Sequence, residues 1–470
     1  MKAKYRRRSP LRTILITLLT LALTVAAGIA GWNWFDNNVD RSGWVHKGGN
    51  TLYKDFHGKY VSGWQEIDGK TCYFREDHTM VVGETVIGGE GYYFSPDGNM
   101  ATHWQTIGNR KCYFGSDGKR RTGWQELEDG RYFFEDDGTM AEGWLTRDAM
   151  RYYLDGGIMV TGWYTIGENR HCFAPTGELL TGWQEIDGET YYLSAEGIPL
   201  TGPTALDGVH FYFNDDGTMY TGWRDTEAGK VLYLSDGTQA FGWAEQEGKR
   251  YFFDEKGLMV TGWLHQGEYS YYLQEDGSAA VGPTKIGLYT HYFTPRGIHV
   301  VLVNASHALP PYYEMELVTV TGWHQVSSVC LEPLKKMLSD CSAAGISYNF
   351  NSAHRTVEEQ TAILELRTQE HMENLGLSFE AARAKALQTV AYPGTSEHHL
   401  GLAVDLLGDA AIEWFTEHCW EYGFIVRYTA DKYPITGIVN EPWHFRYVGT
   451  EVSLDMKDSG LCLEEYLGAA

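Results

Sequence analysis

The distribution of apolar residues divides the chain into three regions. Residues 14–31 form one uninterrupted apolar run, and residues 43–298 contain short aromatic stretches that recur every twenty residues. From residue 299 onward, amphipathic helical patterns alternate with short apolar runs. We therefore expect a multidomain protein. It would consist of an apolar helix within 1–35, an all-β hairpin-repeat solenoid at 43–298 and an α+β domain at 299–470.

The apolar run at 14–31 carries no charge, and a basic flank precedes it. This combination is typical of a cleaved signal peptide or of an uncleaved signal anchor. A span of about 20 residues crosses a bilayer, and Trp32, Trp34 and Phe35 would form an interfacial aromatic belt, which favours the anchor. Small residues from Ala27 onward leave cleavage open. In both cases the positive-inside rule predicts that the remainder of the chain is extracellular.

The region 43–298 contains thirteen registers of a twenty-residue unit. In the copy 181–200, a short strand carries the Trp, Asp187-Gly188 forms a tight turn, and a second aromatic strand follows. A lone hairpin of this size is marginally stable, but stacked hairpins can bury their aromatic residues against each neighbour. The pattern therefore predicts a solenoid. Weaker copies without the Gly-Trp pair lie at Gly83-Glu84, His103-Trp104, Gly202-Pro203 and Gly282-Pro283.

The surplus of aromatic residues, with 16 Trp and 31 Tyr, has more than one interpretation. The rings can form the stacking core of a scaffold without a ligand. Alternatively, aromatic residues of adjacent hairpins can form open cages that hold a quaternary ammonium group, worth about 1–2 kcal/mol per ring, or that stack on sugars. Equilibrium dialysis with choline would distinguish a scaffold from a choline cage.

The Gly-Trp, Asp-Gly and Tyr-Tyr-Phe frame over 43–298 resembles the choline-binding and glucan-binding repeats of Gram-positive surface proteins. This resemblance implies binding to a cell-wall polymer, either choline-bearing teichoic acid or a glycan. It also implies a set of cage residues on the first strands, namely Trp124, Trp144, Trp163, Trp183, Trp223, Trp243 and Trp263. Hairpin tyrosines such as Tyr132, Tyr152, Tyr191 and Tyr251 would complete the cages.

The region 299–470 reads as one α+β domain. Thr356 and Glu359 form the pattern of a capping box at the start of a helix. Helices are expected at 328–345, from 357, between 378 and 393 and at 409–422, and strands at 401–407 and 443–448.

Two segments of this domain contain residues that could bind a metal. Asp405 lies inside an apolar run, where an acid needs a cation, a metal or a helix N-terminus as a partner. His398 lies seven residues earlier, and Gly401 permits the bend that brings the two together. With His444, they are a sufficient zinc set that leaves one position for water. Glu441 could then take a proton from that water.

These segments resemble the zinc D,D- and L,D-carboxypeptidases of bacterial cell walls, the VanY-like group. The motif S-x-H-x-x-G-x-A-x-D at 396–405 and E-x-x-H at 441–444 carry the resemblance, together with 302–313, 352–360 and 423–449. It implies that His398, Asp405 and His444 bind Zn²⁺, that Glu441 is the general base, that Arg355 stabilises the oxyanion, and that Ser396 and Gln360 contact substrate. The expected substrate is a peptidoglycan stem peptide that loses its terminal D-alanine.

The net charge and the absence of two sequence motifs exclude several classes of function. The net charge of −24 argues against phosphate-mediated binding to nucleic acid, and the chain has no phosphate loop and no serine nucleophile elbow. Seven Cys leave a disulfide pairing open. The remaining alternative function is a non-catalytic wall-binding adhesin with a degenerate peptidase domain. The sequence does not separate D,D- from L,D-specificity.

Overall fold

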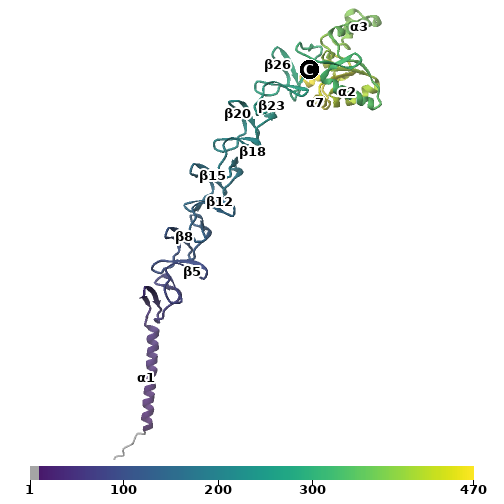
Figure 1. The fold of residues 1–470 in the computed structure, drawn as a ribbon. Coiled ribbons are helices and arrows are strands. Elements are labelled where there is room, and N and C mark those ends of the chain that lie inside the picture. Colours follow the sequence, from purple (N-terminus) through teal and green to yellow (C-terminus); the bar gives the residue numbers. More distant parts are fainter. Residues whose placement is uncertain (1–9) are drawn as a thin grey trace, which may run out of the picture. The chain divides into compact units, whose positions relative to one another are not determined.

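The computed structural model describes residues 10–470 (Figure 1). The basic residues at 1–9, assigned to the export signal, lie outside the described residues. The chain separates into two compact units. One contains the described residues up to Thr201 together with Phe213–Thr218, and the other contains Gly202–Tyr212 and Met219–Ala470.

The N-terminal apolar run forms helix α1, Pro10–Asn38. Its segment Leu11–Trp34 has a mean hydropathy of 2.3, and none of that segment is buried by other parts of the chain. The helix is therefore long and apolar enough to cross a membrane, as the sequence predicts.

The repeat region consists of successive antiparallel hairpins. Each has two strands of five or six residues, except where the short strands β13 and β28 extend a neighbouring sheet. The strands are β1 Gly43–Lys47, β2 Asn50–Lys54, β3 Gly63–Ile67, β4 Lys70–Phe74, β5 Gly83–Ile87, β6 Glu90–Phe94, β7 His103–Ile107, β8 Arg110–Phe114, β9 Gly123–Leu127, β10 Gly130–Phe134, β11 Gly143–Arg147, β12 Met150–Asp155, β13 Ile158–Met159, β14 Gly162–Ile166, β15 Asn169–Phe173, β16 Gly182–Ile186, β17 Glu189–Leu193, β18 Gly202–Leu206, β19 Val209–Phe213, β20 Gly222–Thr226, β21 Gly229–Tyr233, β22 Gly242–Gln246, β23 Lys249–Phe253, β24 Gly262–Gln266, β25 Tyr269–Leu273, β26 Gly282–Ile286, β27 Tyr289–Phe293 and β28 His299–Val300.

The hairpins form because the turn and the core positions repeat. In β3–β4, Asp68 and Gly69 both have positive φ, as a two-residue hairpin turn requires. In most hairpins the last residue of the second strand, such as Phe74 or Phe94, is buried. Gly98 follows a hairpin where a Cβ atom would lie 2.2 Å from the sulfur of Met80, so a glycine is needed there. The repeating core therefore stacks on glycine-containing turns, as the sequence predicts.

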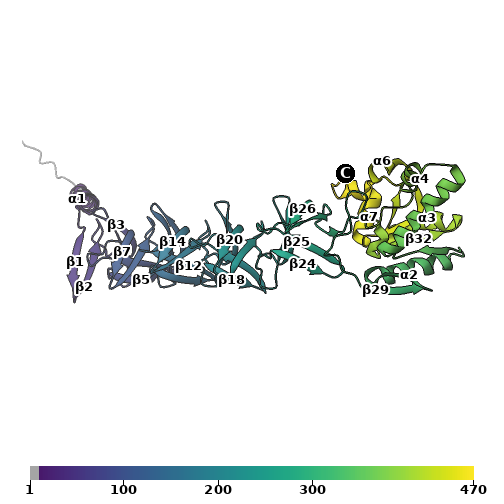
Figure 2. The same ribbon diagram turned by 90° about the horizontal axis from the view of Figure 1, so that it is seen from above.

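The C-terminal region contains several helices (Figure 2). It also contains a four-stranded antiparallel sheet of order β31-β32-β34-β33 and the two-stranded sheet β29-β30. Its elements are β29 Leu317–Thr321, β30 His324–Ser327, α2 Ser328–Ala343, β31 Asn349–Ser352, α3 Val357–Leu375, α4 Phe379–Ala386, η1 Glu397–Leu400, β32 Ala403–Leu407, α5 Asp409–His418, η2 Cys419–Tyr422, β33 Phe424–Tyr428, η3 Ala430–Lys432, α6 Tyr433–Thr436, β34 Glu441–Tyr447, α7 Thr450–Ser459 and α8 Leu463–Tyr466. The α+β fold and the capping box at Thr356 are therefore as expected.

One face of this sheet packs on helices and the other carries polar side chains. Val404, Leu406 and Phe445 share a buried core with residues of α2 and α5, including Leu334 and Phe415. The alternate residues of the same strands must face the other side. The core therefore fixes which side chains can form a site.

The seven Cys are all buried and free within residues 10–470. The disulfide that the sequence left open is therefore absent from the structure. Cys72, Cys112 and Cys172 occupy core positions of the hairpins, where they serve as small apolar residues.

Candidate functional site

The central strands of the C-terminal sheet bring three polar residues into one row. Asp405 of β32 is the register partner of His444 of β34 and of Ser352 of β31. Because side chains alternate along each strand, all three point away from the apolar core. Asp405 and His444 are almost fully buried, and His444 Nδ1 lies 3.0 Å from Asp405 Oδ1.

His398 reaches the same point from the one-turn helix η1. Its Nδ1 donates a hydrogen bond of 2.6 Å to the carbonyl of Ala353, which leaves Nε2 without the proton. Nε2 then lies 3.4 Å from Asp405 Oδ2. Burial, followed by the nearby Arg355, lowers the pKa of His398 to about 4, so the ring is neutral at pH 7. The Gly401 bend that the sequence predicts follows directly, with φ of 66°.

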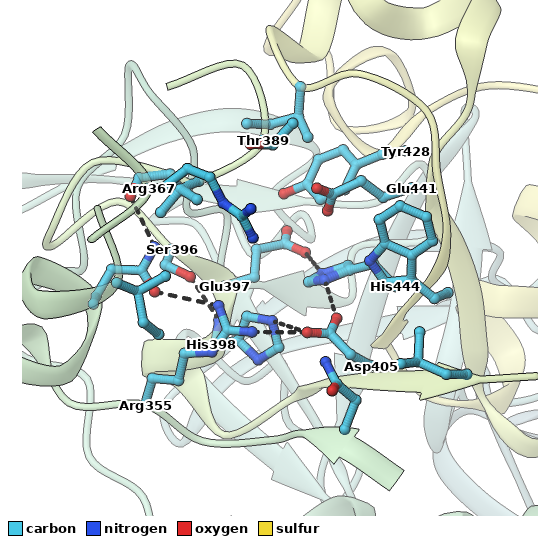
Figure 3. A pocket seen from close by; sticks show the side chains of 18 residues that line it. Arg355, Arg367, Thr389, Ser396, Glu397, His398, Asp405, Tyr428, Glu441 and His444 are labelled. Carbon is cyan, nitrogen blue, oxygen red and sulfur yellow. Dashed lines mark hydrogen bonds and ion pairs between the residues drawn. The ribbon is translucent and has the colours of Figure 1, made fainter. Parts of the chain in front are cut away.

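One ligand atom from each of His398, Asp405 and His444 lies within 4.8 Å of the others. Figure 3 shows the three side chains pointing toward one another. Two imidazole nitrogens and one carboxylate are the donor set of catalytic zinc sites. The chemistry and the convergence of these donors fit a zinc ion.

The other side of the His444 ring faces a buried carboxylate, Glu397. The two atoms His444 Nε2 and Glu397 Oε2 are 3.6 Å apart, within ion-pair range but too far for a hydrogen bond, and neither has another partner. Burial lowers the pKa of His444, but Asp405 and Glu397 outweigh it and raise that pKa to about 9. When Nδ1 gives up its proton to bind a metal, a carboxylate facing Nε2 favours the tautomer that keeps the proton on Nε2.

Glu397 is itself held by two buried arginines. Its Oε1 accepts hydrogen bonds of 2.9 Å from both Arg427 and Arg446. Arg427 also binds Glu464 through two hydrogen bonds, of 2.9 and 2.6 Å. Because all four groups are buried and paired, the network fixes the position of Glu397.

Glu441 begins strand β34 and lines the same pocket as the three candidate ligands. Its side chain is largely buried. Burial raises the pKa of Glu441 to about 7, Asp405 adds to the increase, and His444 and Arg355 oppose it. A carboxylate with a pKa near neutrality can both accept and release a proton. The chemistry of a general base is therefore available at this position.

Arg355 and Gln360 lie at the edge of the cluster. Arg355 donates to Asp405 Oδ2 at 2.7 Å and to Ser352 Oγ at 2.8 Å. Gln360 accepts from Arg355 at 3.4 Å, and its amide nitrogen donates to the carbonyl of Ala391 at 2.8 Å. Both residues line the pocket, and the Gln360 side chain is already bonded at both ends.

Ser396 caps the helix η1 through its hydroxyl, which accepts from the backbone N–H of His398 at 3.4 Å. It also lines the pocket, whose volume is about 330 Å³. The structure thus brings all seven residues predicted for the peptidase site to one pocket, in the positions shown in Figure 3 for six of them. The roles assigned to them remain predictions.

In the repeat array, each of the Trp residues predicted for the cages contacts an aromatic ring of its own hairpin, of the next hairpin or of both. Trp124 lies 5.2 Å from Phe133 and 5.0 Å from Tyr152. Trp163, Trp223 and Trp243 lie 5.1, 4.8 and 4.7 Å from Tyr191, Tyr251 and Tyr271. Trp144 lies 5.3 Å from Tyr153, Trp183 lies 5.1 Å from Tyr192, and Trp263 lies 5.3 Å from Tyr272.

Cations of the chain itself lie over many of these indole rings. The cation is always the residue seven positions after the Trp, on the second strand of the hairpin. The pairs, with the distance from the cation to the ring centroid, are Lys111 on Trp104 at 4.5 Å, Arg131 on Trp124 at 4.7 Å, Arg151 on Trp144 at 4.3 Å, Arg170 on Trp163 at 4.0 Å, Lys230 on Trp223 at 5.2 Å and Arg250 on Trp243 at 4.4 Å. Sequence reasoning missed these cations, although their fixed spacing from Gly-Trp is visible once the repeats are aligned.

The fold and the pocket define a repeat array joined to an α+β domain with a candidate metal centre. Comparison with known proteins names both parts. Residues 323–450 match the VanY family model, described as D-alanyl-D-alanine carboxypeptidase. The choline-binding repeat model matches residues 61–103, 160–197 and 240–282, and a cell wall binding repeat model matches residues 122–140. The chain thus combines a VanY carboxypeptidase domain with choline-binding repeats.

Two curated relatives resemble the C-terminal domain. The D-alanyl-D-alanine carboxypeptidase of Enterococcus faecalis is 38% identical over 175 residues, which cover 36% of this chain and 65% of the relative. The bifunctional D-Ala-D-Ala dipeptidase and carboxypeptidase VanXYC of Enterococcus gallinarum is 38% identical over 128 residues, which cover 24% of this chain and 62% of the relative. The chain therefore spans less than two thirds of the length of either protein.

Solved structures resemble each part separately. A mutant of the vancomycin-resistance D,D-pentapeptidase VanY in complex with Zn(II) is 38% identical, with a TM-score of 0.35, over 36% of this chain and 97% of that one. Choline binding protein F of Streptococcus pneumoniae is 25% identical, with a TM-score of 0.40, over 52% of this chain and 100% of that one.

Proposed function

We propose that this protein is an extracellular zinc carboxypeptidase that removes the terminal D-alanine from peptidoglycan stem peptides and is held at the cell wall by its repeats. The observation that carries the proposal is the convergence of His398, Asp405 and His444 beside Glu441 in one buried pocket. The names of the relatives supply the substrate class.

His398 Nε2, one oxygen of Asp405 and His444 Nδ1 would hold the zinc ion. Zinc in such a site supplies a Lewis acid that makes water nucleophilic at neutral pH. Glu441 accepts the proton of the attacking water and then delivers it to the departing amine of D-alanine. Arg355, at the pocket edge, would stabilise the negative charge that develops on the scissile carbonyl oxygen. Ser396 and Gln360 would shape the substrate side of the pocket.

Three further assignments belong to this proposal. Helix α1 acts as a signal anchor in the membrane. The array at 43–298 binds a wall polymer, and the peptidase domain begins at 299. The array then raises the effective concentration of the enzyme at its polymeric substrate, without adding any contact at the active site.

The decisive experiment measures D-alanine release by mass spectrometry from synthetic stem pentapeptide and tetrapeptide. We expect release from the pentapeptide, loss of release with a chelator, recovery on adding zinc, and at least about a 100-fold loss in Glu441→Ala. Glu413→Ala, an exposed acid on α5, is the matched control and should keep its activity.

The outcomes separate the alternatives. Preference for the tetrapeptide would identify an L,D-carboxypeptidase. Release that resists both the chelator and Glu441→Ala would contradict the zinc mechanism. An absence of release from both peptides in the presence of zinc would favour a non-catalytic wall-binding protein.

A further inference from the structure

The pocket that holds the candidate metal ligands has a second end, which the proposed mechanism does not use. In the view of Figure 3, Asp405 and Arg355 lie in the lower part of the pocket, and Arg367 and Tyr428 lie in the upper part. All four residues line the pocket. At the lower end the cation is fully engaged, because Arg355 donates to Asp405 at 2.7 Å and to Ser352 at 2.8 Å. We call the upper end, with Arg367 and Tyr428, the donor end.

Tyr428, the last residue of β33, contributes a buried hydroxyl to the donor end. The residue is only 7% exposed, and within residues 10–470 its hydroxyl makes no hydrogen bond. Tyr428 is the register partner of Glu441, so the two side chains lie on the same face of the sheet. A phenol is protonated at neutral pH, and a buried polar group normally has a hydrogen-bond partner. The hydroxyl is therefore a donor whose partner would come from a molecule in the pocket.

Arg367 contributes a cation to the same end. On α3, Gln360, Ile363 and Arg367 follow one another at the spacing of one helix face, and all three line the pocket. In the described part of the chain, the guanidinium of Arg367 pairs only with Glu370, at 2.8 Å. The two side chains are 51% and 39% exposed, and exposed pairs of this kind contribute little. Arg367 is therefore available to a second carboxylate.

A guanidinium and a phenol hydroxyl that line one pocket are suited to an anion. Arginine binds carboxylates through parallel N–H groups, and such charge-assisted hydrogen bonds are about twice as strong as neutral ones. Two of the carboxylates that line the pocket are already held by other arginines, since Arg427 donates to Glu397 and Arg355 donates to Asp405. The donor end therefore fits a carboxylate that the substrate brings.

We propose that Arg367 and Tyr428 form a subsite for a carboxylate of the stem peptide. Their position favours an acidic group upstream of the bond that is cut. Arg367 lies seven residues after Gln360, about 10 Å along the helix axis, and an extended peptide covers about 3.3 Å per residue. About three substrate residues can therefore separate this subsite from the metal end. The inference rests on the proposed function for the identity of the peptide.

Peptide binding to the full chain in a non-ionic detergent tests the subsite by isothermal titration calorimetry. Zinc is present, and every protein carries Glu441→Gln, which removes the proposed general base and keeps the peptides intact. The first probe is a stem pentapeptide with D-isoglutamate and meso-diaminopimelate. The second has D-isoglutamine and lysine instead and so lacks both upstream carboxylates. The third keeps the upstream acids and has an amide in place of the terminal carboxylate.

We expect Arg367→Ala to weaken binding of the first peptide about 10- to 100-fold, and Tyr428→Phe to weaken it about 3- to 10-fold. Arg367→Ala should have its full effect on the terminal amide and at most about a twofold effect on the peptide without upstream acids. Two control variants should not weaken binding. Glu370→Gln removes the partner of Arg367 on α3, and Lys385→Ala removes an exposed cation of α4 that does not line the pocket.

Kinetics with Glu441 intact separate this subsite from a structural role. Arg367→Ala should raise KM for D-alanine release from the first peptide about 10-fold and leave kcat within about twofold. The reason is that a contact distant from the reacting bond is equally strong in the ground state and the transition state. A structural role would lower kcat as well.

Several results would overturn the subsite. These are no binding of the first peptide, an equal effect of Arg367→Ala on all three peptides, or equal losses in Glu370→Gln and Arg367→Ala. An effect that disappears only with the terminal amide would support a carboxylate subsite and contradict its assignment to an upstream acid. D-alanine release that ignores Arg367→Ala would contradict the subsite and leave the peptidase standing. Carboxylate-dependent binding by a protein that releases no D-alanine would do the reverse.

Discussion

The array and the peptidase domain build their sites in opposite ways. In the array, a ring such as that of Trp64 contacts rings of two successive hairpins and is 41% exposed, and similar ring contacts recur along the chain. The candidate metal centre consists of His398, Asp405 and His444, which are almost fully buried and occur as one cluster within the described residues. A substitution in the array should therefore remove one binding site among several. A substitution in the metal centre should abolish the whole function of its domain.

The largest effect expected is the loss of the metal centre in Asp405→Ala. This change removes one of the three proposed ligand groups, which is also the carboxylate that contacts His444 and Arg355. We expect zinc content to fall to background and D-alanine release to fall at least about 1,000-fold. Choline binding by the array should stay unchanged. Zinc would be measured by mass spectrometry on the purified protein.

Asp409→Ala is the matched control for that change. Asp409 lies in the first turn of α5, four residues after Asp405, and does not line the pocket. It should retain both zinc and activity. Full zinc content in Asp405→Ala would contradict the ligand assignment, and a loss of choline binding would contradict the independence of the two regions.

A smaller effect is expected from Glu397→Gln. This change removes the negative charge that faces the His444 ring and keeps all three proposed metal ligands. Removing the charge that faces His444 Nε2 should lower zinc affinity about 10- to 100-fold. It also leaves Arg427 and Arg446 less well paired, which should destabilise the fold. Competition with a zinc chelator of known affinity measures the first effect, and thermal unfolding measures the second.

Glu464→Gln distinguishes these two contributions. Glu464 binds the same Arg427 but does not contact His444. It should destabilise the domain in a similar way and leave zinc affinity within about threefold of wild type. Equal losses of zinc affinity in both variants would show that Glu397 acts only through general stability.

The sequence predicts the array well because its determinants are local. A Gly-Trp pair, an Asp-Gly turn and a buried second-strand aromatic such as Phe74 lie within twelve residues and recur many times. The candidate ligands are predictable for a different reason. An acid within an apolar run, Asp405, requires a partner, and His398 lies a short bend away.

Other features depend on contacts that no local pattern reveals. In the sequence, Glu397 is simply a polar residue next to His398. Only the folded structure shows that it lies between Arg427 and the ring of His444. The pKa of Glu441, near 7, results from burial in the folded domain, which no pattern in the sequence reveals. The lysine over Trp104 is an intermediate case, since its position repeats but its effect depends on strand pairing.

The buried carboxylate of Glu441 predicts a pH effect on the stability of the metal-free protein. Its folded pKa of about 7 lies above the ordinary value of 4.5, so the folded state binds the proton more tightly than the unfolded state. The contribution of Glu441 to the free energy of unfolding should therefore increase as pH falls from about 7 to about 4.5. It should be absent above pH 7. Compared with Glu441→Gln, wild type should gain about 2 kcal/mol in unfolding free energy between pH 8 and pH 5.

Denaturant unfolding of the peptidase domain in the presence of a chelator measures this difference. The comparison with Glu441→Gln removes the contributions of other groups, such as Asp405, whose pKa is lowered and whose stabilisation is lost only at more acidic pH. A difference between the two proteins that does not vary with pH would mean that Glu441 is not buried as a charged group at pH 8.

The smallest effect expected concerns a cation that covers a ring in the array. Arg170 lies 4.0 Å over Trp163, and replacing it with Ala should destabilise the hairpin β14–β15 by about 0.5–1 kcal/mol. Thr71→Ala is the matched control, because Thr71 has the same register beside Trp64 but carries no charge. Amide hydrogen exchange in the two hairpins measures the difference. Equal effects would mean that the cation contributes nothing beyond its packing, whereas a loss confined to Arg170→Ala would show that the array uses its own cations to stabilise the rings that they close.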